Sequence, residues 1–512
     1  MTVTDGPAVP IVPEPSGSGP VEAAAGTAPA DFAAWEQQFP DTSRCSHPVL
    51  LSGTVTATDR DTGQTAEVYK TWTTVELPAA PPRTETVRVD SPLYTDCGNR
   101  RESVCPHCSA IYKRDARQLV RSGLAGGKGV PESVSAHPCV FLTLTAPSFG
   151  PVHARRMRGK TVLPCRPRRD ASKRVCPHGR DISCPVRHSP DDPRLGRPMC
   201  GDCYDYEAAV LFNFHATTLW RRFTTYLPRH LARLAGVPVK MARAEVSVSF
   251  VKVAEYQVRG VVHFHAVARL DANVKDAFLP PPSRYTAALL CDAVTLAARA
   301  VRLTVPGSGP RIRLGFGRQL DVRPIWREDF AASGRALDVQ AVANYIAKYA
   351  SKAADVPGLP DTRIRHVSEI DVLHCPAHHK RMVRTAWVLG GRTSAGGPRL
   401  RLWAHMLGYS GHFLTKSRRY SVTFGQLRRA RAEHRKLERY PDGQRDPWGR
   451  PLDETVVLVL KDFTYTGSGD TPRTPGAELA LASADRARAN RQNGRFFVNQ
   501  FLTSNRAFRK EG

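Results

Sequence analysis

The chain has 512 residues, a length that corresponds to about three domains of roughly 150 residues each. Hydrophobic residues make up 41% and charged residues 24%, so the chain can bury sizeable cores and is not globally disordered. Lysine and arginine number 74 against 47 acidic residues, which gives a net charge of +27. Such an excess is typical of proteins that bind a polyanion, above all nucleic acid; the alternative is a basic protein that binds none.

The sequence favours neither a membrane protein nor a secreted one. Asp292 and Arg299 interrupt the longest apolar candidate, so no run reaches the roughly 18 residues of a membrane span. No lysine or arginine precedes Arg44, so the basic start of a signal or transit peptide is not found. We therefore expect a cytoplasmic protein, in which closely spaced cysteines bind metal rather than form disulfides.

Composition and periodicity divide the chain into five regions. These are a disordered leader (1–40), a zinc-binding N-terminal module (41–130), a core (131–360) with a zinc-binding insertion (160–204), a basic DNA-binding extension (361–440) and a partly ordered tail (441–512). Alternating apolar residues predict strands at 139–145, 244–256, 261–270 and 455–460. Apolar stripes predict helices at 204–235, 284–303 and 339–354.

The first chemical motif is His263-Phe264-His265, on a predicted strand. Alternation along the strand places both imidazoles on one face and Phe264 on the other. If residues 258–260 form a three-residue hairpin loop, Glu255 lies directly opposite His263 on that face, and Gln257 is the alternative ligand. Two imidazoles and a carboxylate suit Mn²⁺ or, less typically, Mg²⁺, and leave positions for water and phosphate oxygens. The alternative is two histidines that only hydrogen-bond within the sheet.

The second motif is a pair of tyrosines, Tyr345 and Tyr349, one turn apart on a predicted helix. Lys348 and Lys352 form a neighbouring pair on the same helix. A phenol can attack a phosphodiester that a metal makes more electrophilic, and a nearby lysine can offset the developing phosphate charge. The alternative is an amphipathic helix whose tyrosines pack with their hydroxyls outward.

Together these motifs resemble the HUH endonucleases of the rolling-circle replication initiator type. The order carries the resemblance: a strand at 141–145, then His263-Phe264-His265, then Tyr345 and Tyr349 with Lys348. Segments 252–267 and 404–420 more narrowly resemble Rep proteins of actinobacterial plasmids and integrative elements. The resemblance covers about residues 41–430. Relaxases usually place the tyrosine before the histidine pair, whereas here it follows, as in initiators.

The resemblance implies an α+β fold with an antiparallel-sheet HUH nuclease core and packed helices. His263 and His265 match the metal pair, Tyr349 the primary nucleophile, and Tyr345 the second nucleophile or a helper in termination. Such a protein nicks one strand at a double-strand origin, keeps a 5′-phosphotyrosine link and leaves a 3′-OH for a polymerase. After one round it rejoins the ends. No Walker-type loop is found, so unwinding would fall to a host helicase.

Two cysteine clusters predict structural zinc, with one to three ions in total. The first set is Cys45, Cys97, Cys105 and Cys108, with His47 or His107 as alternatives. The second set is Cys176, Cys184, Cys200 and Cys203. Cys165, His178 and His188 are further candidates there, which leaves the set open and allows a second ion. His374, Cys375, His378 and His379 are a weaker candidate site.

Basic residues near the C-terminal third predict phosphate contacts, with a solvated helix face as the alternative. They are Lys416, Arg418, Arg419 and the 428–439 stretch, together with Lys352. Two other functions remain open. A transposase or relaxase would use the same chemistry, whereas a zinc-containing DNA-binding regulator would use none.

Overall fold

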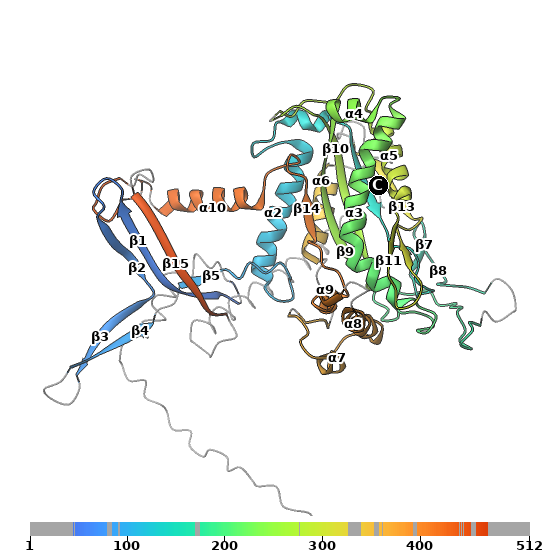
Figure 1. The fold of residues 1–512 in the computed structure, drawn as a ribbon, viewed down its shortest axis with the longest axis horizontal. Helices are drawn as coiled ribbons and strands as arrows, with labels where there is room; N and C mark the ends of the chain where they lie inside the picture. The colour runs from blue at the N-terminus through green and yellow to red at the C-terminus, as the bar shows by residue number, and fades with distance from the viewer. Residues whose placement is uncertain are drawn as a thin grey trace, which may run out of the picture.

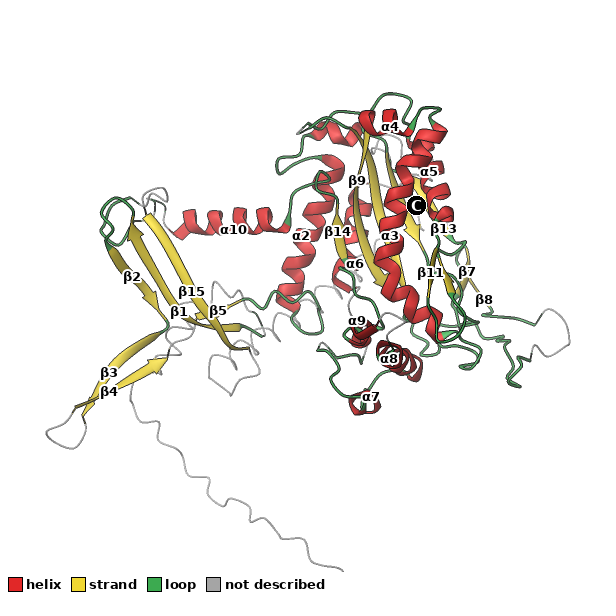
Figure 2. Cartoon of the chain, viewed as in Figure 1, coloured by secondary structure: helices red, strands yellow, loops and turns green. Residues whose placement is uncertain are grey.

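The computed structural model describes residues 45–468, except 46, 79–83, 91–92, 169–174, 276, 326–338, 353–357, 361, 393–396, 440, 442, 444 and 452–456. The expected leader and the end of the expected tail lie outside the described residues. Helices and antiparallel strands are both present, so the predicted α+β class is confirmed (Figure 2).

The centre of the larger body is a five-stranded antiparallel sheet with the order β13-β6-β10-β9-β14 (Figure 1). Its strands are β6 (Cys139–Leu144), β9 (Val246–Tyr256), β10 (Val262–Ala272), β13 (Leu320–Pro324) and β14 (Leu414–Lys416). Three of them lie where apolar alternation predicted strands. β9 and β10 form a long hairpin, so neighbouring side chains on one face come from both strands.

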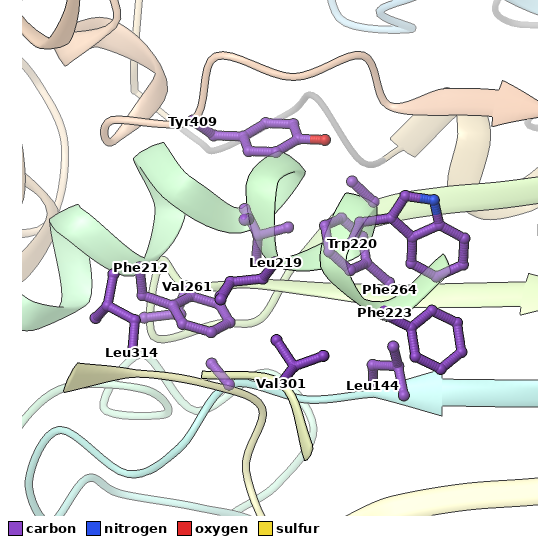
Figure 3. Close-up of a cluster of buried hydrophobic side chains, with 14 of the residues drawn as sticks. Leu144, Phe212, Leu219, Trp220, Phe223, Val261, Phe264, Val301, Leu314 and Tyr409 are labelled. Atoms are coloured by element: carbon purple, nitrogen blue, oxygen red, sulfur yellow. The ribbon is translucent and has the colours of Figure 1, made fainter. Parts of the chain in front are cut away.

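One face of this sheet is covered by α3 (Tyr206–Leu234) and α5 (Ala287–Ala300). The Asp205 side chain caps α3 by accepting a hydrogen bond from the Ala208 amide at 2.8 Å. Leu219, Trp220 and Phe223 of α3 pack over Phe264 and Leu144 of the sheet (Figure 3). These residues belong to the main hydrophobic core. Because the core occupies this face of β10, a functional site on β10 must lie on the opposite face.

The opposite face packs against α2 (Pro106–Ala125) and α6 (Val339–Lys352). Phe141, Val253 and Val267 project from the sheet toward Ile346 of α6. Val253 of β9 and Val267 of β10 have odd numbers, as do Glu255, His263 and His265. The candidate metal ligands therefore lie on the face that α6 partly covers.

A second sheet of four strands joins segments from the two ends of the described part of the chain. Strand β15 (Val457–Ser468) pairs with β1 (Val49–Asp59), which also pairs with β2 (Thr65–Lys70) and β5 (Leu93–Thr95). The helix α10 (Phe424–Arg439) runs from the larger body toward this sheet (Figure 1). Residues assigned from sequence to an N-terminal module and to a C-terminal tail thus share one sheet.

The remaining elements are short hairpins, small helices and 3₁₀ turns. They are β3 (Trp72–Pro78), β4 (Thr84–Asp90), η1 (Glu132–Ala136), β7 (Arg156–Arg158), β8 (Thr161–Leu163), α4 (Val239–Glu245), β11 (Leu303–Val305), β12 (Ile312–Leu314), α7 (Ser368–Asp371), α8 (Ala377–Gly390), α9 (Gly397–Arg401) and η3 (Ala404–Met406).

Candidate metal and nucleophile site

The β9–β10 hairpin determines where the candidate metal ligands lie. Its loop is residues 258–260, closed by hydrogen bonds from the Gln257 amide to Val261 O (2.9 Å) and from the Gly260 amide to Gln257 O (2.7 Å). Gly260 has φ 72°, a left-handed conformation that favours glycine. The resulting register pairs His263 with Glu255, as expected for a three-residue loop.

Three ligand atoms converge on this face. Oε2 of Glu255 lies 2.8 Å from Nε2 of His263 and 3.1 Å from Nε2 of His265. The three groups could hold a metal ion. Gln257, the alternative ligand, instead accepts a hydrogen bond from Arg259 Nε at 2.8 Å. Two imidazoles and one carboxylate fit a hard or borderline divalent cation and leave other positions open.

The neighbouring strand β6 orients His265. Thr143 pairs with His265 across the ladder, and its Oγ1 lies 3.0 Å from Nδ1 of the imidazole. When this hydroxyl accepts the Nδ1 proton, Nε2 keeps the lone pair that a cation requires. Phe141 stacks against the same imidazole, with ring centroids 5.9 Å apart. The sheet thus holds His265 on two sides.

The surroundings favour the protonation states in which Glu255 and His265 can bind a cation. Burial raises the pKa of the Glu255 carboxyl, but hydrogen bonds and charge interactions with His263 and His265 together outweigh burial and hold that pKa below its usual value. Burial lowers the pKa of His265, and the neighbouring carboxylate offsets this only in part. At neutral pH the site therefore presents a carboxylate and a neutral imidazole.

Tyr345 of α6 lies against this triad. Its hydroxyl oxygen is 3.4 Å from His265 Nε2, and its ring meets the imidazole edge to face, with centroids 5.0 Å apart. The side chain is 38% exposed, so a substrate can reach it. Lys348 is an exposed residue of the same helix, whereas the side chains of Tyr349 and Lys352 lie outside the described residues.

Residues of β13 complete the surroundings, and sequence reasoning did not find them. A cavity of about 250 Å³ beside Tyr345 is lined by Thr143, Asp321 and Arg323, among others. Asp321 pairs with Thr143, which in turn pairs with His265, so the three form a row across three strands. Apolar and charged residues alternate in the segment 320–324, but a pattern of five residues is too short to predict a strand from sequence.

The hairpin loop itself is held by buried histidines of α8. Nε2 of His378 lies 3.0 Å from Arg259 O, and Nε2 of His379 lies 3.1 Å from Val258 O. Nδ1 of His378 lies 3.0 Å from the hydroxyl of Tyr206. These contacts give both histidines a structural role, and neither belongs to a group of potential metal ligands among the described residues.

The first cysteine cluster assembles as expected. Cys45, Cys97, Cys105 and Cys108 lie together, with Sγ of Cys45 3.8 Å from Sγ of Cys105 and 3.7 Å from Sγ of Cys108. A tetrahedral zinc ion with Zn–S bonds of about 2.3 Å separates its sulfurs by roughly 3.8 Å. The cluster could therefore hold such an ion, and His47 and His107 are not members of it.

The second cluster differs from the expected set. Cys176, Cys200 and Cys203 lie with His178 rather than with Cys184. Cys184 instead lies with Cys165, His188 and His153. The reason is a backbone bridge between Arg166 and Cys184, which carries Cys184 away from Cys176. His153 was missed because it precedes the cysteine-rich insertion and belongs to no recognisable spacing.

The predicted DNA-binding residues of the basic stretch have different surroundings in the structure. Nζ of Lys416 donates to Ser421 O at 2.6 Å and to two further carbonyls, and Arg419 donates to Ala277 O at 2.6 Å. Both side chains thus bind this protein's own backbone, which their positions in a basic stretch could not reveal. Arg418 is exposed.

Within the described part of the chain, no helix combines the length and apolar character that a membrane crossing requires. No solved structure gives a significant match. The family model RepSA, described as "Replication initiator protein, pSAM2", matches residues 31–485. A curated replication initiator protein of Streptomyces ambofaciens is 40% identical over 480 residues, which cover 92% of this chain and 94% of that relative. The chain therefore belongs to the RepSA family of replication initiator proteins.

Proposed function

We propose that this replication initiator is an HUH-type nuclease that nicks one DNA strand at a double-strand origin and so starts rolling-circle replication. The observation that carries the proposal is the convergence of Glu255, His263 and His265, with the Tyr345 hydroxyl 3.4 Å from His265 Nε2. A binding protein without chemistry has no need for this combination of groups.

The proposed reaction is a transesterification. A tyrosine hydroxyl loses its proton, its oxygen attacks the scissile phosphorus, and the bond from phosphorus to the 3′ oxygen breaks. The 3′ oxygen leaves as a hydroxyl after taking up a proton, and the 5′ phosphate stays on the tyrosine. A bound Mn²⁺ or Mg²⁺ would polarise the phosphate oxygens. The covalent link conserves the bond energy, so a later attack can rejoin the strands.

Each residue then has a defined task. Glu255, His263 and His265 would hold the cation, and Thr143 would keep Nε2 of His265 available to it. Tyr345 is the tyrosine whose hydroxyl lies at the site, and Tyr349 follows one turn later on α6. We assign one strand transfer to each, with Tyr349 ranked first by the family resemblance. Lys348 would offset charge on the phosphate.

The free 3′-OH would be extended by a host polymerase, with unwinding by a host helicase. The zinc-binding modules would brace the nuclease core. Exposed Arg418 and the side chains of α10 would contact phosphates beside the origin.

The test is a covalent protein–DNA adduct. The purified chain is incubated with Mn²⁺ and labelled single-stranded DNA from the origin of its own element, then run on a denaturing gel. We expect an adduct that is abolished in His263→Ala and strongly reduced in one of Tyr345→Phe and Tyr349→Phe. Tyr465→Phe is the matched control, because Tyr465 is 65% exposed and lies on β15.

The outcomes separate the alternatives. Loss in Tyr349→Phe makes Tyr349 the first nucleophile, and loss only in Tyr345→Phe gives that role to Tyr345. If the folded protein binds the origin but forms no adduct with any divalent metal, the nuclease proposal fails, and a DNA-binding regulator takes its place.

A further inference from the structure

A second group of possible metal ligands lies at the insertion, apart from the Cys176 group. Nδ1 of His153 lies 3.3 Å from Nε2 of His188, and Sγ of Cys184 lies 3.6 Å from the same Nε2. Cys165 completes the group. A tetrahedral zinc ion with Zn–N bonds of about 2.05 Å and Zn–S bonds of about 2.3 Å separates two nitrogens by roughly 3.4 Å and nitrogen from sulfur by roughly 3.6 Å. The donor atoms are thus already at tetrahedral spacing.

The surroundings of this group also suit a bound cation. Nδ1 of His188 lies 2.7 Å from Oδ2 of Asp192, so the carboxylate can orient the ring and leave Nε2 for a metal. The Ala154 amide donates to Sγ of Cys165 at 3.2 Å, a hydrogen bond that a metal-bound sulfur can also accept. Cys165 and His188 are each only 1% exposed.

The same segment forms one wall of a basic groove. The groove has a volume of about 760 Å³ and is lined by the segment that follows β6, the β9–β10 hairpin loop, the loop before β13 and residues 152–155. Its lining contains four arginines and, among the described residues, no carboxylate: Arg155, Arg166, Arg259 and Arg318. A groove of this charge fits a phosphate backbone.

The arginines divide into two kinds. Arg259 donates to Pro147 O, Ala146 O and Gln257 Oε1, and Arg166 donates to Val152 O, so both are engaged with the protein. Arg155 and Arg318 are exposed and can meet a ligand. They enter the groove from different segments, which would place phosphate contacts on two sides of a strand.

The groove lies next to the candidate nuclease site. Gln257 and Gln319 line it, and they stand two residues beyond Glu255 on β9 and two residues before Asp321 of β13. Two residues of a strand span about 7 Å, roughly the spacing of adjacent phosphates in an extended single strand. A strand whose scissile phosphate lies at the triad can therefore continue into the groove.

We propose that His153, Cys165, Cys184 and His188 bind a structural zinc ion that shapes this groove, and that the groove binds the single-stranded DNA next to the nick. The inference rests on the proposed nuclease function for its substrate. His153 is both a ligand and a lining residue, Arg155 follows it by two positions, and Arg166 directly follows Cys165. Without the ion this wall of the groove would no longer be held in place, and Arg155 and Arg166 would lose their fixed positions.

Zinc content tests the metal centre in the full-length protein. With the Cys45 and Cys176 groups filled, we expect three zinc ions per chain by inductively coupled plasma mass spectrometry and two in Cys184→Ala. Cys291→Ser is the matched control, because Cys291 is a half-buried thiol on α5 outside every group, and it should keep three. Asp192→Asn leaves all ligands in place and should only speed the loss of one zinc to a chelator. Unchanged zinc content in Cys184→Ala overturns the proposed site.

DNA binding tests the groove, in a Tyr345→Phe and Tyr349→Phe background that cannot react. The probe is a fluorescent single-stranded oligothymidylate, read by anisotropy against salt concentration. Changing both Arg155 and Arg318 to Gln should weaken binding about tenfold at low salt and reduce the salt slope by about 1.4, because two phosphate contacts are lost. Arg243→Gln with Arg299→Gln, exposed positions on α4 and α5, is the control that should change neither.

The outcomes also separate this inference from the nuclease proposal. If the Arg155 and Arg318 changes, or the loss of the Cys184 zinc, leave the Kd for the oligonucleotide unchanged while the otherwise wild-type protein still forms an adduct, the groove is not the DNA site and the nuclease stands. If binding weakens as expected but no adduct forms with intact tyrosines, the groove stands and the nuclease proposal fails.

Discussion

The hydroxyl oxygen of Tyr345 lies 3.4 Å from Nε2 of His265, the same nitrogen that lies 3.1 Å from the Glu255 carboxylate. A phenol is therefore placed at the atom through which His265 would bind a cation. Phe141 fixes this relationship, because its ring stacks on His265 and meets Tyr345 edge to face with centroids 5.6 Å apart. The sheet and α6 thus hold Tyr345 and His265 in one packed cluster.

Thr143 offers a test of how His265 is oriented. Thr143→Val removes the hydroxyl that lies 3.0 Å from His265 Nδ1 and keeps the shape of the side chain. We expect the Mn²⁺ concentration needed for half-maximal adduct formation to rise about 10- to 100-fold, because ligand partners of this kind typically have that effect on metal affinity. Thr143→Ser should restore it. An unchanged Mn²⁺ requirement in the valine variant would show that Thr143 does not orient a metal ligand.

Acid should weaken metal binding at the triad. The pKa of Glu255 is held below its usual value by hydrogen bonds and charge interactions that together outweigh burial, and burial lowers the pKa of His265. Both groups are then in their cation-binding forms at neutral pH, and protons compete with the metal only as the pH falls. We expect the Mn²⁺ affinity, measured by isothermal titration of the Tyr345→Phe protein, to be flat near neutrality and to fall on acidification.

Substitution of one ligand provides the control for this pH dependence. Glu255→Gln cannot be protonated at the changed position, so its weaker Mn²⁺ binding should vary less steeply with pH. A wild-type affinity that stays constant into the acid range would contradict the assignment of these groups as ligands.

The sequence was sufficient wherever the local pattern determines the structure. Alternation located β9 and β10, and a three-residue loop was enough to place Glu255 opposite His263. The first cysteine set was also predictable, since a Cys-x-x-Cys turn at Cys105 and Cys108 starts α2 and needs only two more thiols to form a possible metal site. In the hairpin and in the Cys105–Cys108 turn, neighbours in sequence are neighbours in space, whereas Cys45 and Cys97 join from distant segments because metal-ligand chemistry restricts the choice to thiols.

Features that depend on distant contacts were not predictable. Cys184 was assigned to the wrong partners because the backbone bridge to Arg166 is invisible in the spacing of cysteines. Lys416 lies in a basic stretch, yet its Nζ binds carbonyls. Asp321 reaches the site only because β13 pairs with β6, a pairing between segments far apart in the chain. Charge and spacing carry no information about such pairings.

Arg259 should be important for the hairpin rather than for DNA. Its guanidinium donates to Pro147 O at 2.8 Å, to Ala146 O at 3.0 Å and to Gln257 Oε1. Arg259→Ala leaves these half-buried acceptors without a charged donor, and we expect a loss of about 1–3 kcal/mol in the free energy of unfolding. Chemical denaturation measures it.

The exposed Arg318 is the matched control for this experiment. Arg318→Ala removes a charge from the same groove but should leave the unfolding midpoint unchanged. Equal stability of the two variants would mean that Arg259 does not hold the loop.

Lys252 predicts an unusual dependence of stability on pH. This lysine of β9 is 2% exposed, its ammonium lies 4.4 Å from the centre of the Phe264 ring, and burial lowers its pKa to about 7. Between about pH 7 and about 10.5 the unfolded chain holds a proton at this position that the folded chain has lost. The lysine's contribution to stability therefore rises with pH across this window, by about 5 kcal/mol in total.

Lys252→Met isolates this effect, because a flexible apolar chain of similar length replaces a buried ammonium. We expect the variant to be more stable than wild type near neutral pH and the difference to shrink as the pH rises toward 10, measured as the difference in thermal midpoint at each pH. Lys416→Met should instead be less stable than wild type near neutral pH, since Nζ of Lys416 donates to Ser421 O at 2.6 Å and its loss leaves carbonyls unpaired. A constant difference between Lys252→Met and wild type at every pH would mean that Lys252 stays charged in the fold, with the Phe264 ring compensating for the lost water.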